Sequence, residues 1–169
     1  MQQHRALILR SNRFLASSLF DEGLISNGNL NAANEMFMGA IQSHELLKTT
    51  SLLSILISEL KVLDEAKLLD HLFEQHSLGI IDLNYIELSS LPIADLDMSL
   101  CRASLSLPFD KVDGIYMVAT CYYMSTPVVK HWEALLNGKI IWYATSMASM
   151  HQSLERLESF LTAKQVTQE

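Results

Sequence analysis

The apolar positions of residues 51–83 predict two short helices followed by a buried strand. In the first helix, apolar side chains recur at steps of three and four residues, which places them on one helical face. They are Leu52, Leu53, Leu56, Ile57 and Leu60. The second apolar stripe consists of Leu68, Leu69, Leu72 and Phe73. Asp64 is suited to cap this second helix, because its carboxylate can accept from the free N–H groups of the next turn. Gly79 is expected to end the segment, and Ile80–Leu83 has strand character.

Two longer helices are predicted before this module. The first covers Ser11–Phe20, is capped by its first residue or by Asn12, and ends at Gly23 in a left-handed C-terminal cap. The six residues before it give no clear signal. The second helix is expected from Leu30 to about Lys48, with Asn29 in a preceding Asn-Gly-Asn turn as its cap. The side chains expected to face inward from the first helix are Phe14, Leu15 and Leu19.

The last 80 residues mix short strands with helices. Two apolar runs, Leu105–Phe109 and Ile115–Tyr122, flank Asp113-Gly114, which is a typical hairpin turn. Thr126-Pro127 favours a helix start, with a hydroxyl cap followed by proline at the first helical position. That helix should stop at Asn137-Gly138.

Three further elements complete this half. A helix is expected over residues 94–103, and a strand over Lys139–Ala144. The final helix is expected to be capped by Ser146 or Ser149. The predicted fold class is therefore α+β. It has an N-terminal helical subdomain of paired short helices, residues 1–88, and a small α/β subdomain with a short sheet covered by helices, residues 89–169. The boundary is placed in the Ser89–Pro92 loop.

Composition and charge exclude several functions. Nearly half of the 169 residues are apolar, which suffices for a folded core, and the formal charge is −7. An acidic balance argues against nucleic-acid binding, which needs a basic face. No apolar run reaches the roughly 20 residues that span a bilayer, so no direct membrane insertion is expected. Cys101 and Cys121 stand alone, which favours reduced, buried thiols in the cytoplasm.

Catalytic and metal motifs are weak. The phosphate-binding pattern GxxxxGK[ST] is absent: the one Gly-Lys pair, Gly138-Lys139, leads into a predicted strand. His71 and His76 are five residues apart, which places them on different helical faces and does not suit a metal pair. We therefore predict no metal site and no enzyme, although a pair of catalytic carboxylates, and hence an enzyme of an unrecognised type, stays possible on sequence grounds.

Two leucine-rich segments occur in the same order as the two repeats of a known domain. The first runs through Phe14-Leu15-Ala16, Gly23–Ser26, Leu30 and Ala33. The second runs through Leu53-Ser54, Leu60–Leu63 and Gln75 to Gly79–Leu83. Together they resemble the MshEN domain, the N-terminal region of the assembly ATPases of type II secretion and type IV pilus systems. The chain resembles a degenerate form of that domain, with a longer spacer between the repeats and without the ATPase engine.

The resemblance implies a non-enzymatic adaptor or regulatory module. In that family this region docks onto the cytoplasmic part of an inner-membrane platform protein. A similar partner is therefore expected here, either such a platform protein or a glycosyltransferase or other secretion component. The implied location is the cytoplasm, at the inner face of the inner membrane through that partner.

The resemblance also implies an alternative, because some MshEN domains bind cyclic di-GMP through both repeats. The candidate ligand-binding residues carried over in that case are Arg13, Phe14, Leu15, Gly23, Leu53, Ser54 and Gln75. The family repeat opens Arg-Leu-Gly, whereas here Arg13 is displaced by one residue, which turns a helical side chain by about 100°. The second repeat has no cation at its start and carries Lys61 at its later glycine position. Phe37 replaces an expected glutamine. We therefore expect no cofactor, with cyclic di-GMP as the alternative.

Overall fold

The computed structural model describes residues 4–42, 51–87, 91–92 and 96–166. Within these ranges a four-stranded mixed sheet is packed against helices, so the α+β fold class is confirmed. The helices of the N-terminal half are α1 (Arg5–Asp21), α2 (Asn27–Gln42), α3 (Leu52–Ser54), the π-helix η2 (Ile55–Glu59) and α4 (Glu65–His76). The later helices are η3 (Leu83–Tyr85), α5 (Met98–Ser104), α6 (Thr126–Leu136) and α7 (Met147–Val166). The strands are β1 (Gly79–Ile80), β2 (Ser106–Val112), β3 (Ile115–Thr120) and β4 (Ile140–Ala144).

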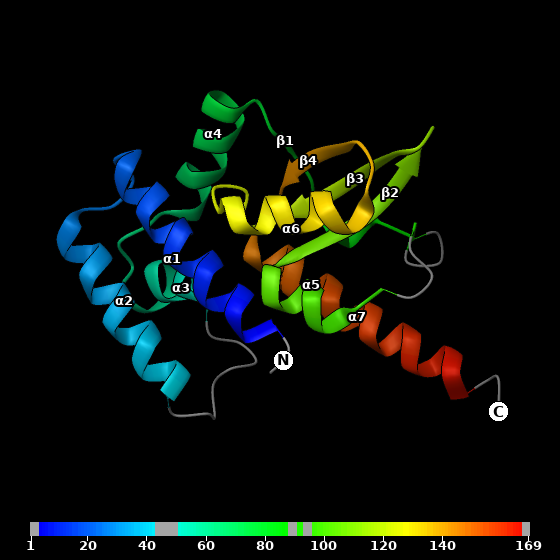
Figure 1. The fold of residues 1–169 in the computed structure, drawn as a ribbon, viewed down its shortest axis with the longest axis horizontal. Helices are drawn as coiled ribbons and strands as arrows, with labels where there is room; N and C mark the ends of the chain where they lie inside the picture. The colour runs from blue at the N-terminus through cyan, green and yellow to red at the C-terminus, as the bar shows by residue number, and fades with distance from the viewer. Residues whose placement is uncertain (1–3, 43–50, 88–90, 93–95, 167–169) are drawn as a thin grey trace.

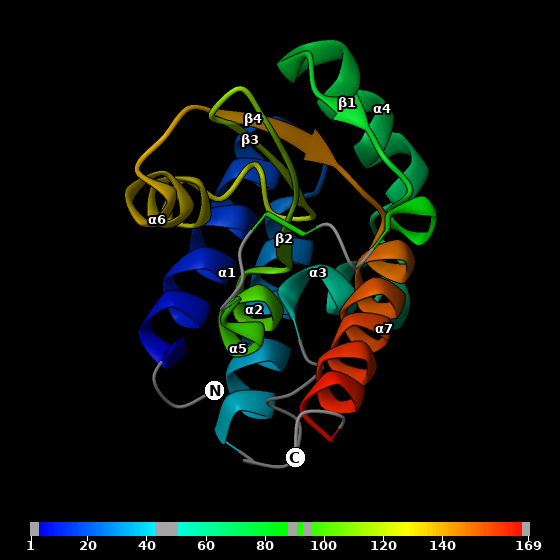
Figure 2. The same cartoon turned by 90° about the vertical axis from the view of Figure 1, so that its right-hand side faces the viewer.

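The sheet joins the two halves of the chain. Its order is β1-β4-β3-β2, with β1 and β3 parallel to β4 and β2 antiparallel to β3. Helices α6 and α7 lie on opposite sides of the sheet, and α1 to α3 pack beside it (Figures 1 and 2). One cluster of buried apolar side chains runs from Ile8 to Leu157. The division at residues 88/89 stays a prediction, but the two halves share a sheet and a core.

Helix α1 begins at Arg5, so the predicted start at Ser11 is wrong. Ser11 and Asn12 do not cap the helix but are buried inside it. Their side chains donate hydrogen bonds to the Ile8 carbonyl, at 3.0 Å and 2.8 Å. These bonds to a carbonyl of the preceding turn satisfy the two polar side chains inside the helix. The sequence pattern alone does not distinguish such a residue from a helix cap.

The predicted start of the second helix also needs correction. Helix α2 begins at Asn27, within the predicted turn. The side chain that serves the helix start is that of Ser26, whose Oγ accepts from the Asn29 N–H at 3.2 Å. Asn29 is therefore not the cap. The predicted end near Lys48 lies outside the described residues.

The helices of the leucine-rich module occur where they were predicted, but the strand expected over Ile80–Leu83 is the two-residue β1, and Leu83 begins η3. Asp64 caps α4, with Oδ1 accepting from the Ala66 N–H at 2.9 Å. Helix α4 ends at the left-handed Ser77 (φ 55°) rather than at Gly79. Gly79 instead lies in β1, where an added Cβ would come within 2.8 Å of the Tyr143 ring. A side chain at this position would force that ring to move.

Two aromatic side chains expected in the core are on the surface. Phe14 is 47% exposed and Phe73 is 59% exposed. Both lie at the edge of the apolar stripe of their helix. Spacing of three and four residues assigns such a position to the apolar face, but it does not show whether another element covers the side chain.

The hairpin prediction is confirmed, but the helix expected over residues 94–103 is α5, which begins only at Met98 with Asp97 as its cap. β2 and β3 pair antiparallel, and Asp113 and Gly114 adopt the positive φ values, 50° and 80°, that a type I′ turn needs. Helix α6 starts at Thr126, but its N-cap position is Ser125, so the predicted threonine cap is wrong. Ser146 accepts from the Ser149 N–H at 3.2 Å at the start of α7, as one of the predicted alternatives requires.

Asn12 connects three parts of the core. Its Oδ1 accepts hydrogen bonds from the Leu52 N–H at 2.8 Å and from the Tyr122 hydroxyl at 2.5 Å, while its Nδ2 donates to Ile8. Asn12 is 2% exposed and Tyr122 is 1% exposed. The amide therefore ties α1 to the start of α3 and to the chain after β3, in a place that water does not reach.

We predict that Asn12→Ala lowers the free energy of unfolding by about 2–4 kcal/mol, because it removes three buried hydrogen bonds and leaves two donors without a partner. Tyr122→Phe should cost only about 0.5–1.5 kcal/mol, since it removes one hydrogen bond and keeps the ring. The exposed Asn31→Ala in α2 is the matched control and should change stability by less than about 0.5 kcal/mol. Urea unfolding followed by circular dichroism measures all three, and an equal effect of Asn12→Ala and Asn31→Ala would contradict the assignment.

Candidate functional site

Two grooves flank α1. The first lies between α1 and α2, has a volume of about 330 Å³, and is lined by Leu9, Arg13, Asn34, Phe37 and Met38. The second lies between α1 and α6 and has a volume of about 340 Å³. Its lining residues are Leu7, Arg10, Phe14, Thr126, Pro127, Lys130 and His131. Consecutive residues of α1, Arg13 and Phe14, thus reach into different grooves, as the rotation of about 100° per residue requires.

The structure does not bring the seven candidate ligand-binding residues together. Arg13 lines the α1–α2 groove and Phe14 the α1–α6 groove. Leu15 and Leu53 are each 1% exposed and belong to the core.

The remaining three candidates have other roles or positions. Ser54 forms a capping box with Ser51: the Ser54 N–H donates to Ser51 Oγ at 3.0 Å, and the Ser51 N–H donates to Ser54 Oγ at 3.3 Å. Gln75 is on the exposed surface of α4, and Gly23 follows the end of α1. Whether any of the seven contacts a ligand stays a prediction.

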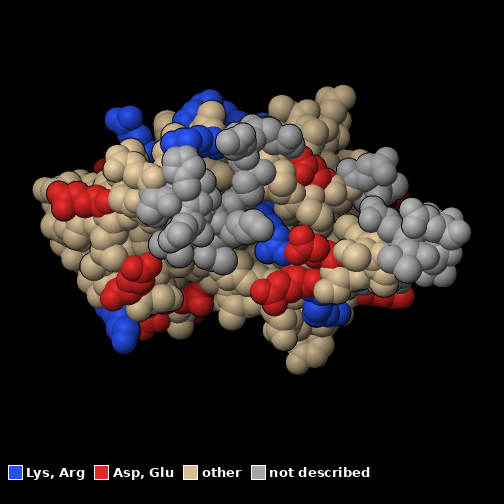
Figure 3. Space-filling view, turned by 90° about the horizontal axis from the view of Figure 1, so that it is seen from below, with Lys and Arg blue, Asp and Glu red and all other residues tan. Residues whose placement is uncertain are grey.

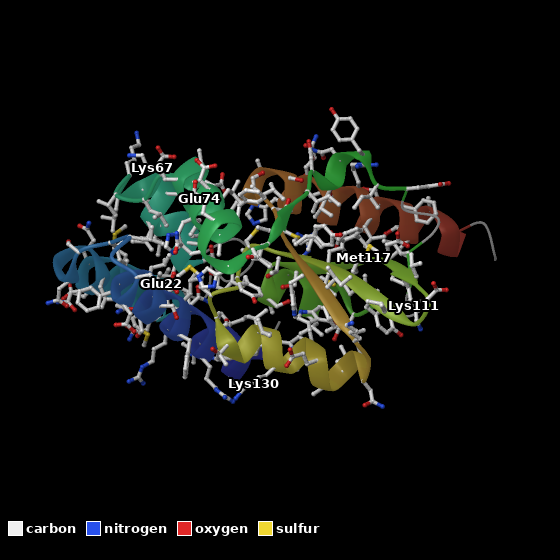
Figure 4. The ribbon with its side chains drawn as sticks, turned by 90° about the horizontal axis from the view of Figure 1, so that it is seen from above. Glu22, Lys67, Glu74, Lys111, Met117 and Lys130 are labelled. Atoms are coloured by element: carbon white, nitrogen blue, oxygen red, sulfur yellow. The ribbon has the colours of Figure 1, made fainter. Side chains whose placement is uncertain are left out.

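The α1–α6 groove combines an apolar floor with positive charge. Phe14 is half exposed in it, beside Arg10 and Lys130. Desolvation by burial, together with the charge of His4, lowers the pKa of His131 below its ordinary value, so this ring is neutral at neutral pH. Figure 4 shows Lys130 on the outer side of α6. In the view from below, several Lys and Arg side chains gather along the upper edge, and further basic side chains are scattered with acidic ones over the rest of that face (Figure 3). The groove is therefore a basic, partly apolar surface on an acidic chain.

Gly23 and Lys61 occupy equivalent backbone positions in the two repeats. Both have positive φ, 74° for Gly23 and 53° for Lys61. After each, the next N–H bonds back into the helix that has just ended: Leu24 to the Leu19 carbonyl at 2.9 Å, and Val62 to the Leu56 carbonyl at 3.0 Å. The two segments therefore make the same left-handed turn, with glycine in the first and lysine in the second.

One cluster was missed by sequence reasoning. His71 and His76 both hydrogen bond through Nε2 to Oε2 of Glu22, the second at 2.9 Å, and their ring centroids are 5.8 Å apart. The prediction that the five-residue spacing keeps the two rings apart is therefore wrong. Both rings turn towards the carboxylate of Glu22 at the end of α1. Because Glu22 is distant in the sequence, the spacing of the two histidines within α4 does not reveal this contact.

The electrostatics of this cluster follow from its hydrogen bonds. Desolvation by burial alone would raise the pKa of Glu22. The hydrogen bonds and charges of His71 and His76 outweigh it and lower that pKa below its ordinary value.

The two cysteines are free and buried, as expected. Desolvation by burial raises the pKa of both Cys101 and Cys121, with a smaller contribution from the nearby Asp97 and Glu65 carboxylates, respectively. Both thiols are therefore protonated at neutral pH, and the thiolate needed for nucleophilic chemistry is not available. No helix among the described residues is both long enough and apolar enough to cross a membrane.

The fold of helices packed beside a small mixed sheet is shared with MshE and with the N-terminal domain of XpsE, so the MshEN-like fold expected from the sequence is confirmed. MshE with cdg matches with a TM-score of 0.53 at 21% identity, covering 85% of this chain and 97% of that chain. Two crystal structures of the N-terminal domain of XpsE match with TM-scores of 0.55 and 0.53 at 11% and 13% identity. They cover 86% and 83% of this chain and 94% and 91% of theirs. No family model and no curated protein sequence matches the chain.

We predict that Lys61→Gly raises the free energy of unfolding by about 0.5–1 kcal/mol. The left-handed conformation costs a non-glycine residue about 1–2 kcal/mol, and the greater freedom of glycine in the unfolded chain offsets part of the gain. Lys67→Gly is the matched control in the first turn of α4, where the backbone is right-handed and the same change should cost up to about 1 kcal/mol. Denaturant unfolding of the two variants should thus give shifts of opposite sign. Destabilisation by both would contradict the backbone strain assigned to the left-handed Lys61.

Proposed function

We propose that this chain is a non-enzymatic protein-interaction module that docks onto a partner of an envelope assembly system. The observation that carries the proposal is the α1–α6 groove, where a half-exposed aromatic side chain lies between two cations. Aromatic side chains in a concave apolar patch are typical anchors of protein interfaces. The groove has the dimensions to receive the side chains of an amphipathic segment, as in helix-in-groove recognition.

The positive charge beside the groove favours a partner with acidic side chains. Arg10 and Lys130 border the groove of a chain whose net charge is −7, so a partner segment with acidic side chains beside its apolar anchor is favoured there and repelled by most of the remaining surface. The partner we propose is the cytoplasmic part of an inner-membrane platform protein, or a glycosyltransferase or other secretion component. The module would then act in the cytoplasm, held at the inner face of the inner membrane by that partner.

Similarity to MshE and XpsE supports this proposal at the level of the domain type. Both matches are to N-terminal regions of assembly ATPases, and they cover nearly all of the matched chains. The buried, protonated thiols and the shallow grooves agree with a role in recognition rather than in bond-breaking chemistry.

A second candidate function is cyclic di-GMP sensing. The observation that favours it is the α1–α2 groove, where Arg13 lies beside Asn34, Phe37 and Met38. A guanidinium can pair with a phosphate or a guanine edge, and an aromatic ring can stack on a base. MshE, whose structure is described with cdg, shares the fold. Against this function, only one of the seven candidate residues lines the groove, and the second repeat supplies no cation at its start.

We predict that Phe14→Asp abolishes partner capture, because it places a carboxylate in a groove that we expect to receive acidic and apolar side chains. The test is affinity capture from an extract of the organism that encodes the chain, followed by identification of enriched envelope assembly components and a binding titration with the purified cytoplasmic part of the component found. Phe160→Asp is the matched control, because Phe160 is a 37% exposed phenylalanine on α7.

The expected outcome is an envelope assembly component that the parent and Phe160→Asp capture equally and that Phe14→Asp fails to capture while keeping its circular dichroism spectrum. Failure of the folded parent to enrich any such component would overturn the proposed function. Equal capture by all three forms would remove the α1–α6 groove as the docking surface.

A further inference from the structure

Glu22, His71 and His76 bring three metal-ligating atoms together. The two imidazole Nε2 atoms and a Glu22 carboxylate oxygen all lie within 4.8 Å of one another. The carboxylate is exposed and the two rings are half buried, so an ion can enter from solvent. The cluster lies at the C-terminal end of α1, whereas the α1–α6 groove is lined by earlier residues of that helix. Neither the proposed docking nor the dinucleotide alternative assigns a role to these three residues.

Two of the three side chains come from the ends of helices, and His71 comes from the middle of α4. Glu22 is the residue directly after α1 and is followed by the left-handed Gly23. His76 is the last residue of α4 and is followed by the left-handed Ser77. Both helices therefore stop at the cluster, and the backbone turns away from it on either side.

Neighbouring rings orient His76. Its imidazole packs edge-to-face against Tyr123, with centroids 5.7 Å apart, and Tyr123 packs in the same manner against Trp142 at 6.3 Å. A ligand ring held by packing loses less freedom when it binds an ion. These contacts also link the cluster to β4 and to the chain after β3.

We propose that these three residues form a binding site for a divalent zinc-class metal ion that fastens α1 to α4. Two imidazoles and one carboxylate are a ligand set that zinc uses in proteins, with water in the fourth position. Tetrahedral bonds of about 2.0–2.1 Å place ligand atoms about 3.3 Å apart. The Nε2–Oε2 pair at 2.9 Å already approaches this separation, so rotations of the side chains are enough to admit the ion.

Binding of the ion changes the protonation of the two imidazole rings. In the metal-free site each Nε2–H donates a hydrogen bond to Glu22. A metal ion needs the lone pair of Nε2, so a neutral ring must change to the Nδ1–H tautomer when the ion binds. A charged ring instead releases its Nε2 proton to solvent. The ion then replaces two hydrogen bonds to one oxygen with three coordinate bonds. Because α1 belongs to the first repeat and α4 to the second, the ion would hold the two repeats together, and its open position could accept a ligand atom from a partner.

The test is calorimetric titration of the full chain with zinc ions, at a pH above the ordinary pKa of histidine and in a buffer that does not bind zinc. Thermal unfolding with and without zinc is measured in parallel. We expect one ion per chain and a higher unfolding temperature with zinc, since a ligand that binds only the folded state stabilises it. His71→Ala and His76→Ala should each weaken binding by more than about tenfold, because loss of a ligand exceeds the effect of losing a second-shell partner.

Two further variants keep the result interpretable. Glu22→Gln retains the size and hydrogen-bonding capacity of the side chain but removes the anionic ligand, so it should weaken zinc binding while the metal-free protein unfolds near the parent temperature. His151→Ala on α7 is the matched histidine control and should bind zinc as the parent does. Absence of saturable zinc binding by the parent, or equal affinity of the parent and the two histidine variants at positions 71 and 76, would overturn the proposal and leave the cluster as hydrogen bonds and ion pairs only.

Discussion

The structure depends on one buried amide, that of Asn12. It lies inside α1 and accepts hydrogen bonds from the first helical N–H of α3 and from Tyr122, beyond the end of β3. A polar group this deeply buried is tolerated only when its partners are in place, so the amide fixes the rotation and the height of α1 against the rest of the core. The two grooves on the flanks of α1, with Arg13 in one and Phe14 in the other, take their separation from that rotation.

The amide acts together with other polar contacts between the two halves of the chain. Ser125, at the N-cap position of α6, donates its hydroxyl hydrogen bond to the Ser11 carbonyl of α1 at 2.8 Å. On the other side, Ser149 of α7 accepts from the Leu83 N–H at 2.8 Å. With β1 paired to β4, these contacts connect the helical repeats to the sheet. A partner bound at α1 and α6 would therefore rest on a surface to which both halves contribute.

Local patterns in the sequence predict most of the elements but not the contacts between them. A few adjacent residues determine the Asp64 cap, the Asp113-Gly114 hairpin and the end of α6, and these three predictions are confirmed. Ser11 and Asn12 look like capping residues on their own, and only the burial of α1 shows that they serve the core instead. The Glu22–His71–His76 cluster joins residues 49 and 54 positions apart, so no spacing rule within α4 could reveal it. The exposed position of Phe14 likewise depends on how closely α6 approaches α1.

The two leucine-rich segments share a backbone turn although their side chains differ. Lys61 retains the left-handed turn that Gly23 makes in the first repeat, and the leucines below both turns stay in one core. Phe37 and Met38 line the groove beside Arg13, and Arg13 is the single cation among its described lining residues, whereas cyclic di-GMP carries two phosphates. The proposed docking role rests instead on the α1–α6 groove, where the exposed Phe14 lies beside Arg10 and Lys130. Calorimetric titration of the folded chain with cyclic di-GMP tests this account most directly. The account predicts no heat beyond dilution at micromolar ligand, whereas saturable binding that is weakened by Arg13→Ala would contradict it.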